Sequence, residues 1–279
     1  MIPAYVLVEG IQALPSLPES VARLTPLLRD ERASSGRFEQ AVRSDPAITA
    51  NLLKAANSAY FSGNAPVSTV REAVARIGLR RVYEVAVSTS FRQTLPRRLP
   101  GYGLNGSDFW LHCTATALFA EALAVRGNHR CADIAYIAGL LHDAGKLIIG
   151  GFLAVEVPEA NWWTFGTDEG ERQLLGSSHC DVGKEIARKW NLPLQVEQAC
   201  RWHHEPGRAL TEEQIELASV VHAADALAYR AGFPGGSSDG PDLDPAVALR
   251  LGLTPESLDR LIEEKKEEIL HLGEVSSPS

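Results

Sequence analysis

The sequence predicts an all-α protein with a multi-helical fold. Apolar residues recur at helical spacing in one segment after another, and the first ~100 residues show no sustained period-two alternation of the kind that marks a half-buried strand. Helix-start signals precede several segments, for example Asp45-Pro46 and Thr254-Pro255. We expect three parts: a helical part over residues 1–104, a second helical part over 105–234, and a loop with a charged helix over 235–279.

In the first part, short helices joined by capped turns are expected. Leucines and a valine within residues 17–28 recur at helical spacing. A further helix starts at Asp45-Pro46, where the carboxylate can accept from free N–H groups and the missing N–H of proline has no cost. Asn57-Ser58 ends that helix, and residues 68–72 have the spacing of a capping box that starts the next one.

The remainder of the chain continues the helical pattern. Residues 95–106, rich in Pro, Arg and Gly, predict a connection, and a helix begins near Ser107. The helices predicted after it span residues 132–141, 182–190, 196–204 and 215–229. A Gly- and Ser-rich loop over 235–241 precedes the last helix, which starts at Thr254 and ends at Gly273.

Composition argues against several classes of function. The 279 residues are 45% hydrophobic and 22% charged, and a formal net charge of -8 argues against nonspecific nucleic-acid binding. No apolar run approaches the roughly 20 residues of a membrane-spanning helix, and residues 1–9 lack the basic start of a signal peptide. Four scattered cysteines indicate reduced thiols in a cytoplasmic protein. We therefore expect no specific nucleic-acid partner and no membrane.

The most informative feature is the His142-Asp143 pair at the end of the apolar stretch 138–146. An imidazole and a carboxylate are costly to bury unpaired, and a metal ion removes that cost because both groups are good ligands for Fe, Mn or Zn. The alternative is a helix end that carries two solvated polar residues. Further His and Asp residues beside apolar runs favour the metal, and the candidate ligands are His112, His142, Asp143, His179, His203, His204 and Asp225.

Five of the eight histidines belong to this candidate set. Helices packed around one core can project such side chains toward a shared point, and seven N and O ligands with one bridging carboxylate suffice for two metals. For His203-His204 the alternative is a surface pair, because adjacent helical residues point about 100° apart. The lack of clustered thiolates argues against a structural zinc site of the Cys type.

Lys146 lies three residues after Asp143, so on a continuing helix both side chains face the same way. A lysine at this place could hold a phosphate oxygen as a point charge. The alternative is an ordinary solvated lysine, and the sequence leaves both open. Asp143 and Lys146 are therefore the candidate catalytic residues.

Eight sequence blocks, taken together, have a specific order and spacing. They are LPSLP at 14–18, DP at 45–46, LLKAANS at 52–58, AVARIGL at 73–79, WLHC at 110–113, HDAGK at 142–146, HHEP at 203–206 and HAAD at 222–225. By these blocks, the second half resembles the HD superfamily of metal-dependent phosphohydrolases. Residues 10–230 as a whole resemble the bacterial HDOD family.

The resemblance implies an assignment of the metal ligands. By analogy with the related HD-GYP phosphodiesterases, His112, His142, Asp143 and Asp225 would hold one ion. The second ion would be held by His179, His203 and His204, with Asp143 bridging. Many HDOD proteins lack part of this set, whereas this sequence keeps it whole. We expect two divalent ions, with iron as the first expectation and manganese or zinc as alternatives.

The chain departs from the HD-GYP pattern at one motif. Those proteins follow their His-His-Glu with a glycine-rich Gly-Tyr-Pro segment, whereas this chain continues from Glu205 as Pro206-Gly207-Arg208-Ala209. The departure speaks against cyclic-di-GMP hydrolysis and leaves other phosphoesters open.

These observations lead to alternative functions for a bacterial signal-transduction protein. The first is a metal-dependent phosphohydrolase, a phosphodiesterase or phosphatase, that takes a small phosphoester or nucleotide; two metals would activate a water and neutralise phosphoester charge. The second is a non-catalytic module with a structural or vestigial metal, whose first half binds a signalling protein. A third, oxygen chemistry at a di-iron site, would use the same ligands.

Overall fold

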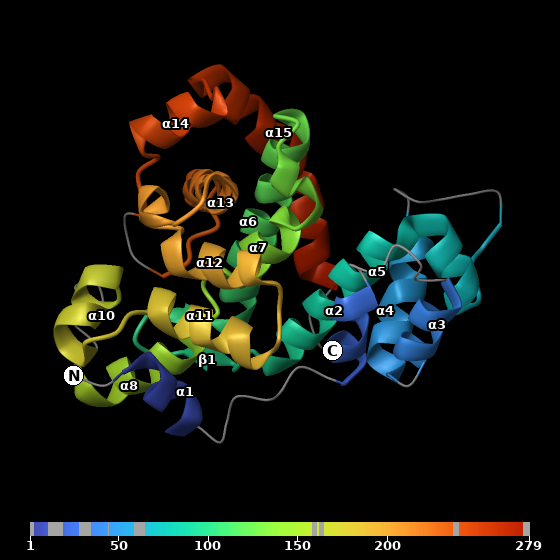
Figure 1. The fold of residues 1–279 in the computed structure, drawn as a ribbon, viewed down its shortest axis with the longest axis horizontal. Coiled ribbons are helices and arrows are strands. Elements are labelled where there is room, and N and C mark those ends of the chain that lie inside the picture. The colour runs from blue at the N-terminus through green and yellow to red at the C-terminus, as the bar shows by residue number, and fades with distance from the viewer. Residues whose placement is uncertain are drawn as a thin grey trace. The chain divides into compact units, whose positions relative to one another are not determined.

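The computed structural model is 75% helical with few strand residues, which confirms the predicted all-α fold class (Figure 1). It describes residues 3–10, 19–27, 35–43, 45–58, 65–157, 161, 165–236 and 240–275. The LPSLP block at 14–18, part of the 235–241 loop and the last four residues lie outside the described residues. The chain divides into two compact units, one made of Met1–Leu14 with Leu95–Ser279 and the other of Pro15–Thr94.

The Pro15–Thr94 unit holds four of the described helices. They are α2 (Glu19–Leu27), α3 (Ser35–Arg43), α4 (Pro46–Ala56) and α5 (Val70–Thr94). The start of α4 is as expected, because an Asp45 carboxylate oxygen accepts from the N–H groups of Ala47 and Ile48, both at 3.0 Å. Buried Leu24, Phe38, Ile48, Leu52 and Phe91 form its core.

The other unit contains the remaining helices and one short hairpin. In chain order they are α1 (Ala4–Gly10), β1 (Arg98–Leu99), β2 (Leu104–Asn105), α6 (Gly106–Arg126), η1 (Arg130–Asp133), α7 (Ala135–Leu141), α8 (Lys146–Glu156), α10 (Asp168–Leu175), α11 (His179–Lys189), α12 (Leu194–Trp202), η3 (Pro206–Arg208), α13 (Glu212–Arg230), α14 (Pro245–Leu251) and α15 (Pro255–Val275). The two strands pair antiparallel, Arg98 opposite Asn105, within the segment for which the sequence predicted only a connection.

Two long helices, α6 and α13, pack on each other and on α7 at the centre of this unit. Both helices are buried along most of their length, and their central turns carry mostly small and apolar side chains. Gly139 lets α7 approach α6 closely, because a Cβ at this position would lie 2.8 Å from the Thr116 carbonyl oxygen. Helices α11 and α12 pack on each other, and α12 also contacts α7 and α13 (Figure 1).

One stretch, Ala135–Glu156, is long and apolar enough by length and composition to span a membrane, which the sequence analysis did not expect. In the structure it comprises α7 and α8 with a turn over residues 142–145 between them, and 78% of its most apolar window is buried inside the protein. The stretch also carries the ionisable side chains of His142, Asp143 and Lys146, all buried. It therefore forms part of the core.

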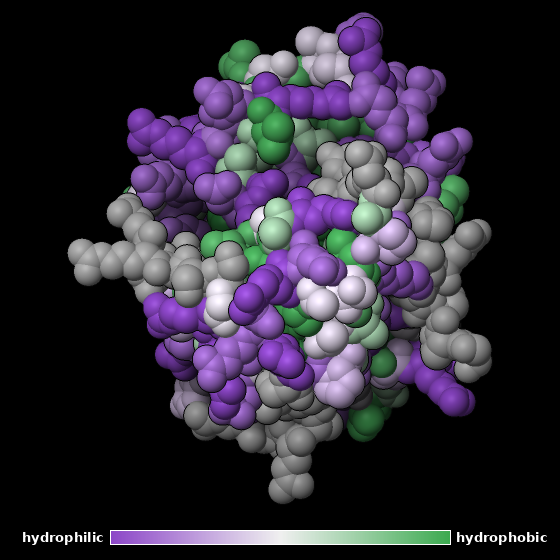
Figure 2. Space-filling model, turned by 90° about the vertical axis from the view of Figure 1, so that its right-hand side faces the viewer, coloured by the Kyte–Doolittle hydropathy of each residue, from purple (hydrophilic) through white to green (hydrophobic). Residues whose placement is uncertain are grey.

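The face of the molecule drawn in Figure 2 is dominated by hydrophilic side chains. Among the described residues on that face, hydrophobic side chains show as small separate spots. Scattered single apolar side chains are normal on protein surfaces. The candidate ligands of the sequence lie in the interior of the unit that contains α6–α13.

Candidate metal centre

The seven predicted ligands come from five places in the fold and meet in one region. His112 lies in α6 and Asp225 in α13, while His179 is the first residue of α11. The other four occupy turns at helix ends: His142 and Asp143 follow α7, and His203 and His204 follow α12. Six of the side chains are at most 3% exposed, and His204 is half-buried.

One group of side chains gathers around His112. The Nε2 atom of His112 lies 3.3 Å from Nε2 of His142 and 3.3 Å from Oδ1 of Asp225. Oδ1 of Asp225 is 3.7 Å from Nε2 of His142. Oδ2 of Asp143 is 3.5 Å from the Nε2 atoms of both His112 and His142. These four residues are the ones that the resemblance assigned to the first metal.

A second group lies on the other side of Asp143. Nε2 of His179 is 3.1 Å from Nε2 of His204. Oδ1 of Asp143 is 3.4 Å from Nε2 of His179 and 3.7 Å from Nε2 of His203. The two carboxylate oxygens of Asp143 thus face the two groups separately, which is the placement that a bridging ligand requires.

Hydrogen bonds at the outer ring nitrogens set the protonation of three of these imidazoles. A backbone carbonyl only accepts, so each Nδ1 that faces one carries the proton, and Nε2 of the neutral ring presents a lone pair. The Nδ1–carbonyl pairs are His112 with Phe233 at 2.9 Å, His142 with Gly139 at 2.7 Å and His203 with Cys200 at 2.9 Å. Inward lone pairs from several rings are the arrangement of a metal site.

Two carboxylate oxygens of the donor set have no hydrogen-bond partner among the described residues. Oδ1 of Asp143 and Oδ1 of Asp225 are buried and accept no hydrogen bond from any residue that the structure describes. Burial alone would lower the pKa of His142, yet the charge on Asp143 raises it above its ordinary value. Burial and the neighbouring His179 lower the pKa of His204 to about 4, which keeps that ring neutral. Inward-facing imidazole nitrogens and buried carboxylate oxygens without a hydrogen-bond partner together fit a divalent cation.

Lys146 is buried, at 5% exposure, so it is not the solvated lysine of the alternative interpretation. Its ammonium group donates to Oδ2 of Asp143 at 2.5 Å and to the Gly235 carbonyl oxygen at 2.9 Å. Burial alone would lower the pKa of Lys146, but the Asp143 carboxylate raises it above its ordinary value. A permanent positive charge therefore stands beside the candidate metal ligands.

The surface-pair alternative for His203-His204 does not describe their placement. His203 is fully buried, and the two ring centroids lie 4.1 Å apart. Both residues follow the last turn of α12, so helical geometry does not separate their side chains.

Cys180 also lies close, but its Sγ atom is 3.9 Å from both ring nitrogens of His203. This equal spacing puts the sulfur beside the ring, away from the direction of the Nε2 lone pair.

Two residues of the site were missed by the sequence analysis. Glu171 is fully buried and accepts from Nδ1 of His179 at 2.8 Å, and the Tyr102 hydroxyl donates to Glu171 at 2.6 Å. Neither belongs to a motif that the sequence analysis singled out. The one signal was an acidic residue eight positions before a candidate ligand, which alone predicts nothing.

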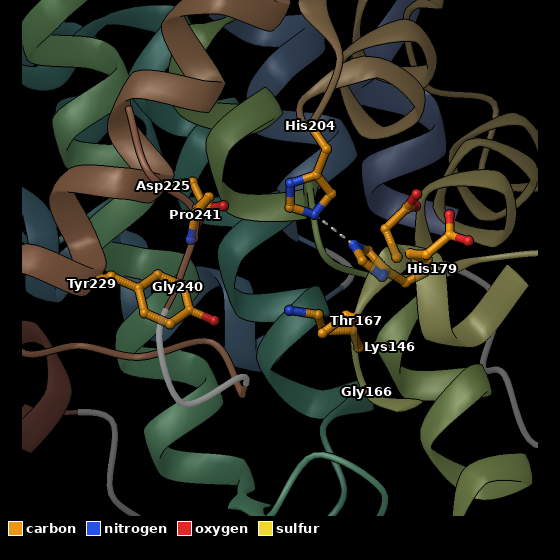
Figure 3. Close-up of a pocket in the computed structure, with 11 residues that line it drawn as sticks. Lys146, Gly166, Thr167, His179, His204, Asp225, Tyr229, Gly240 and Pro241 are labelled. Atoms are coloured by element: carbon orange, nitrogen blue, oxygen red, sulfur yellow. Dashed lines mark hydrogen bonds between the residues drawn. The ribbon is translucent and has the colours of Figure 1, made fainter. Parts of the chain in front are cut away.

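A pocket of about 270 Å³ opens beside the candidate metal centre (Figure 3). His179 and His204, whose Nε2 atoms lie 3.1 Å apart, line it together, and the Lys146 ammonium points into the space below them. Asp225 and the Tyr229 ring lie on the opposite side. A small ligand in this pocket would therefore meet residues of both halves of the set and the lysine charge.

Comparison with known proteins places this geometry in a family context. The family model described as HDOD domain matches residues 14–206. Among longer curated proteins, one from Treponema pallidum (strain Nichols), named "Uncharacterized protein", is 25% identical over 232 residues, which is 77% of this chain. The chain spans 42% of that protein's length, so it covers less than half of this relative.

Solved structures share the fold over nearly the whole chain. An HDOD domain protein of unknown function from Geobacter sulfurreducens has a TM-score of 0.77 at 23% identity, covering 98% of this chain and 95% of that one. A "Putative signal transduction protein" from Marinobacter aquaeolei VT8 has a TM-score of 0.74 at 24% identity, covering 97% and 61%. A "Putative phosphohydrolase" from Shewanella amazonensis SB2B has a TM-score of 0.70 at 20% identity, covering 98% of each chain. At these identities the likeness shows the fold.

Proposed function

The chain belongs to the HDOD family, and from this premise we propose that it is a signal-transduction protein whose metal centre hydrolyses a small phosphoester. The observation that carries the proposal is Asp143, whose two oxygens face two separate groups of inward imidazole nitrogens. The name of the Shewanella amazonensis neighbour supports the reaction class.

The residues that would hold the metals follow from the two groups. His112, His142 and Asp225 would hold one ion, and His179, His203 and His204 the other, with Asp143 shared. Iron is the first candidate, with manganese and zinc as alternatives, because imidazole and carboxylate suit all three. When bound, such ions supply a water of lowered pKa and positive charge against a phosphoryl group.

The protein's own residues would supply binding and orientation. Lys146, held against Asp143 and the Gly235 carbonyl, would place its ammonium on a phosphate oxygen in the adjoining pocket. Tyr229 offers an aromatic face on the opposite wall, suited to an apolar or aromatic group of a substrate. The missing Gly-Tyr-Pro segment speaks against a cyclic dinucleotide as that substrate.

The test is hydrolysis of a broad panel of phosphomonoesters and phosphodiesters by protein loaded with iron or manganese. We expect turnover of at least one member, and a loss of about 10²-fold in kcat for Lys146→Met, which removes the charge but keeps the side-chain length. His129→Ala serves as the matched control, because this histidine pairs with Glu216 outside the candidate set. No turnover by metal-loaded protein across the panel would contradict the reaction.

A second candidate is a non-catalytic signalling module with a structural metal. It is favoured by the Lys146 ammonium, which lies 2.5 Å from Oδ2 of Asp143 and balances the charge of this carboxylate. The buried carboxylate is therefore stable without a catalytic role. The name of the Marinobacter aquaeolei neighbour fits a signalling context. This candidate predicts that a specific signalling protein binds the chain and still binds the His142→Ala variant.

The proposed setting is the cytoplasm. The four cysteines are free and buried, which supports a reducing compartment. Fractionation of cells that produce the chain, with detection of the protein in each fraction, checks this setting. Recovery with the membrane or outside the cell would contradict it.

A further inference from the structure

Glu171 is a carboxylate with no exposed surface, and both of its oxygens lie within hydrogen-bond distance of His179. One of its oxygens accepts from the backbone N–H of His179 at 2.5 Å and lies 2.8 Å from Nδ1 of the same ring. The other oxygen is 3.1 Å from this Nδ1. Burying a charged group is costly unless it is paired, so this side chain is held for its contacts with His179.

The local sequence explains how Glu171 reaches His179. Thr167 caps α10, which places Glu171 in its first turn, and Gly176 ends the helix in a left-handed conformation. After a short turn, Ser178 and Asp181 form the capping box of α11. His179 is then the first helical residue, and its N–H is one of the free donors of a helix start. Glu171 binds this donor and the ring together, so both backbone and side chain are fixed.

Tyr102 fixes Glu171 in turn. It lies in the turn of the β1–β2 hairpin, is 2% exposed, and donates its hydroxyl to Oε1 of Glu171 at 2.6 Å. Burial and the Glu171 carboxylate raise the pKa of the Tyr102 phenol well above its ordinary value, so it stays protonated at neutral pH and remains a donor. The Lys146 ammonium lies 5.5 Å from the centre of the same ring. Tyr102 therefore touches both Glu171 and Lys146.

We infer that Glu171 and Tyr102 are a positioning pair that keeps the proton of His179 on Nδ1, aims its Nε2 lone pair at the shared centre, and so sets the affinity of the second metal. The inference rests on the proposed function, because it requires that the His179 group binds an ion. A carboxylate behind a histidine ligand fixes its tautomer and raises its basicity, and losing such a partner commonly lowers metal affinity about 10- to 100-fold.

The alternative is that the buried network only stabilises the fold. The two roles differ in what they change: a structural network lowers stability and leaves metal affinity of the folded protein unaltered. A positioning pair lowers the affinity of the second ion and leaves that of the first unchanged, because the Nδ1–H groups of His112 and His142 donate to backbone carbonyls and not to Glu171.

The test is a calorimetric titration of the metal-free full chain with Zn²⁺, which is diamagnetic and allows ¹⁵N NMR of the histidine rings on the same samples. The variants are Glu171→Gln, which removes the charge, and Tyr102→Phe, which removes only the hydroxyl. Glu84→Gln is the matched control, since Glu84 is also a buried carboxylate, 3% exposed, but bonds Arg81 in the other unit.

We expect Glu171→Gln to lose about 10- to 100-fold in affinity for the second equivalent, together with a changed His179 Nδ1–H resonance, and Tyr102→Phe to lose less. Glu84→Gln should match the wild type. If Glu171→Gln fails to fold, Tyr102→Phe carries the test by the same two readouts. If the wild type binds two equivalents of metal and the variants bind them with the same affinities, the inference is wrong and the proposed function stands. Wild type with no second equivalent would overturn the proposed function as well.

Discussion

At the scale of the residue, Asp143 has two roles that compete for the same carboxylate. Oδ2 accepts a hydrogen bond from the Lys146 ammonium at 2.5 Å. The two oxygens also lie 3.4–3.7 Å from Nε2 atoms of the two imidazole groups. Without a metal, lysine is the cation that balances this buried charge. Substitution at either residue therefore changes stability as well as function, and the two effects can be separated.

The Asp143→Asn substitution in metal-free protein leaves the Lys146 ammonium buried without its carboxylate partner. Removing one member of a buried pair costs about 3–5 kcal/mol, so the free energy of unfolding should fall by about that much. The double variant Asp143→Asn/Lys146→Met should recover most of the loss, because it removes both charges of the pair and leaves neither one buried alone. Urea denaturation followed by circular dichroism measures both changes. Additive losses in the double variant would show that the pair is not coupled.

At the scale of the element, helix starts were predictable because their signals are local. The expected starts at Asp45-Pro46 and near Ser107 agree with α4 and with α6, which begins at Gly106. The Glu171–Tyr102 contact was not predictable, because it joins residues 69 positions apart, one in the turn of the β1–β2 hairpin and the other in α10. The sequence spacing carries no information on such a contact.

The positions of the predicted ligands within or beyond a helix were only partly predictable. His203 occupies a turn after α12, although the sequence predicted a helix over residues 196–204, whereas His142 follows α7 just beyond the helix predicted over 132–141. A helical pattern predicts which side chains share a face of the helix. Beyond the helix end, the direction in which a side chain points depends on the conformation of the following turn. The candidate set was found from residue types and order, and its geometry came only from the structure.

Helix α8 offers a direct check of how the hairpin is held. A Cβ on Gly150 would lie 2.7 Å from the Pro100 carbonyl oxygen and 3.3 Å from the Tyr102 ring. Gly150→Ala should therefore lower the free energy of unfolding by about 1–3 kcal/mol, as overpacking does. Gly151→Ala, in the same helix with nothing within 4 Å, should raise it by about 0.5–1 kcal/mol through helix propensity. Thermal unfolding of both variants tests this, and equal effects would contradict the packing of α8 against the hairpin.

At the scale of the whole molecule, the candidate ligands belong to one compact unit. All seven lie within Leu95–Ser279, and none lies in Pro15–Thr94. A ligand that binds only the folded state stabilises it by about 2.7 kcal/mol at a hundred times its Kd. Metal binding should therefore protect one unit in preference to the other.

Hydrogen exchange with and without manganese measures this selective stabilisation. We expect slower exchange after metal addition in α6, α7, α11, α12 and α13, which carry or flank the ligands, and little change in α2–α5. His142→Ala is the control and should show no response to the metal. Protection confined to Pro15–Thr94 would mean that the ion binds elsewhere.

The central claim is that this HDOD chain holds a complete metal centre, and metal content tests it most directly. The protein is purified without chelators or a metal-binding tag, and iron, manganese and zinc are quantified beside His142→Ala and the control His129→Ala. We expect two equivalents in the wild type and in His129→Ala, and their loss in His142→Ala. A wild type that contains no metal and takes none up when it is supplied would contradict it.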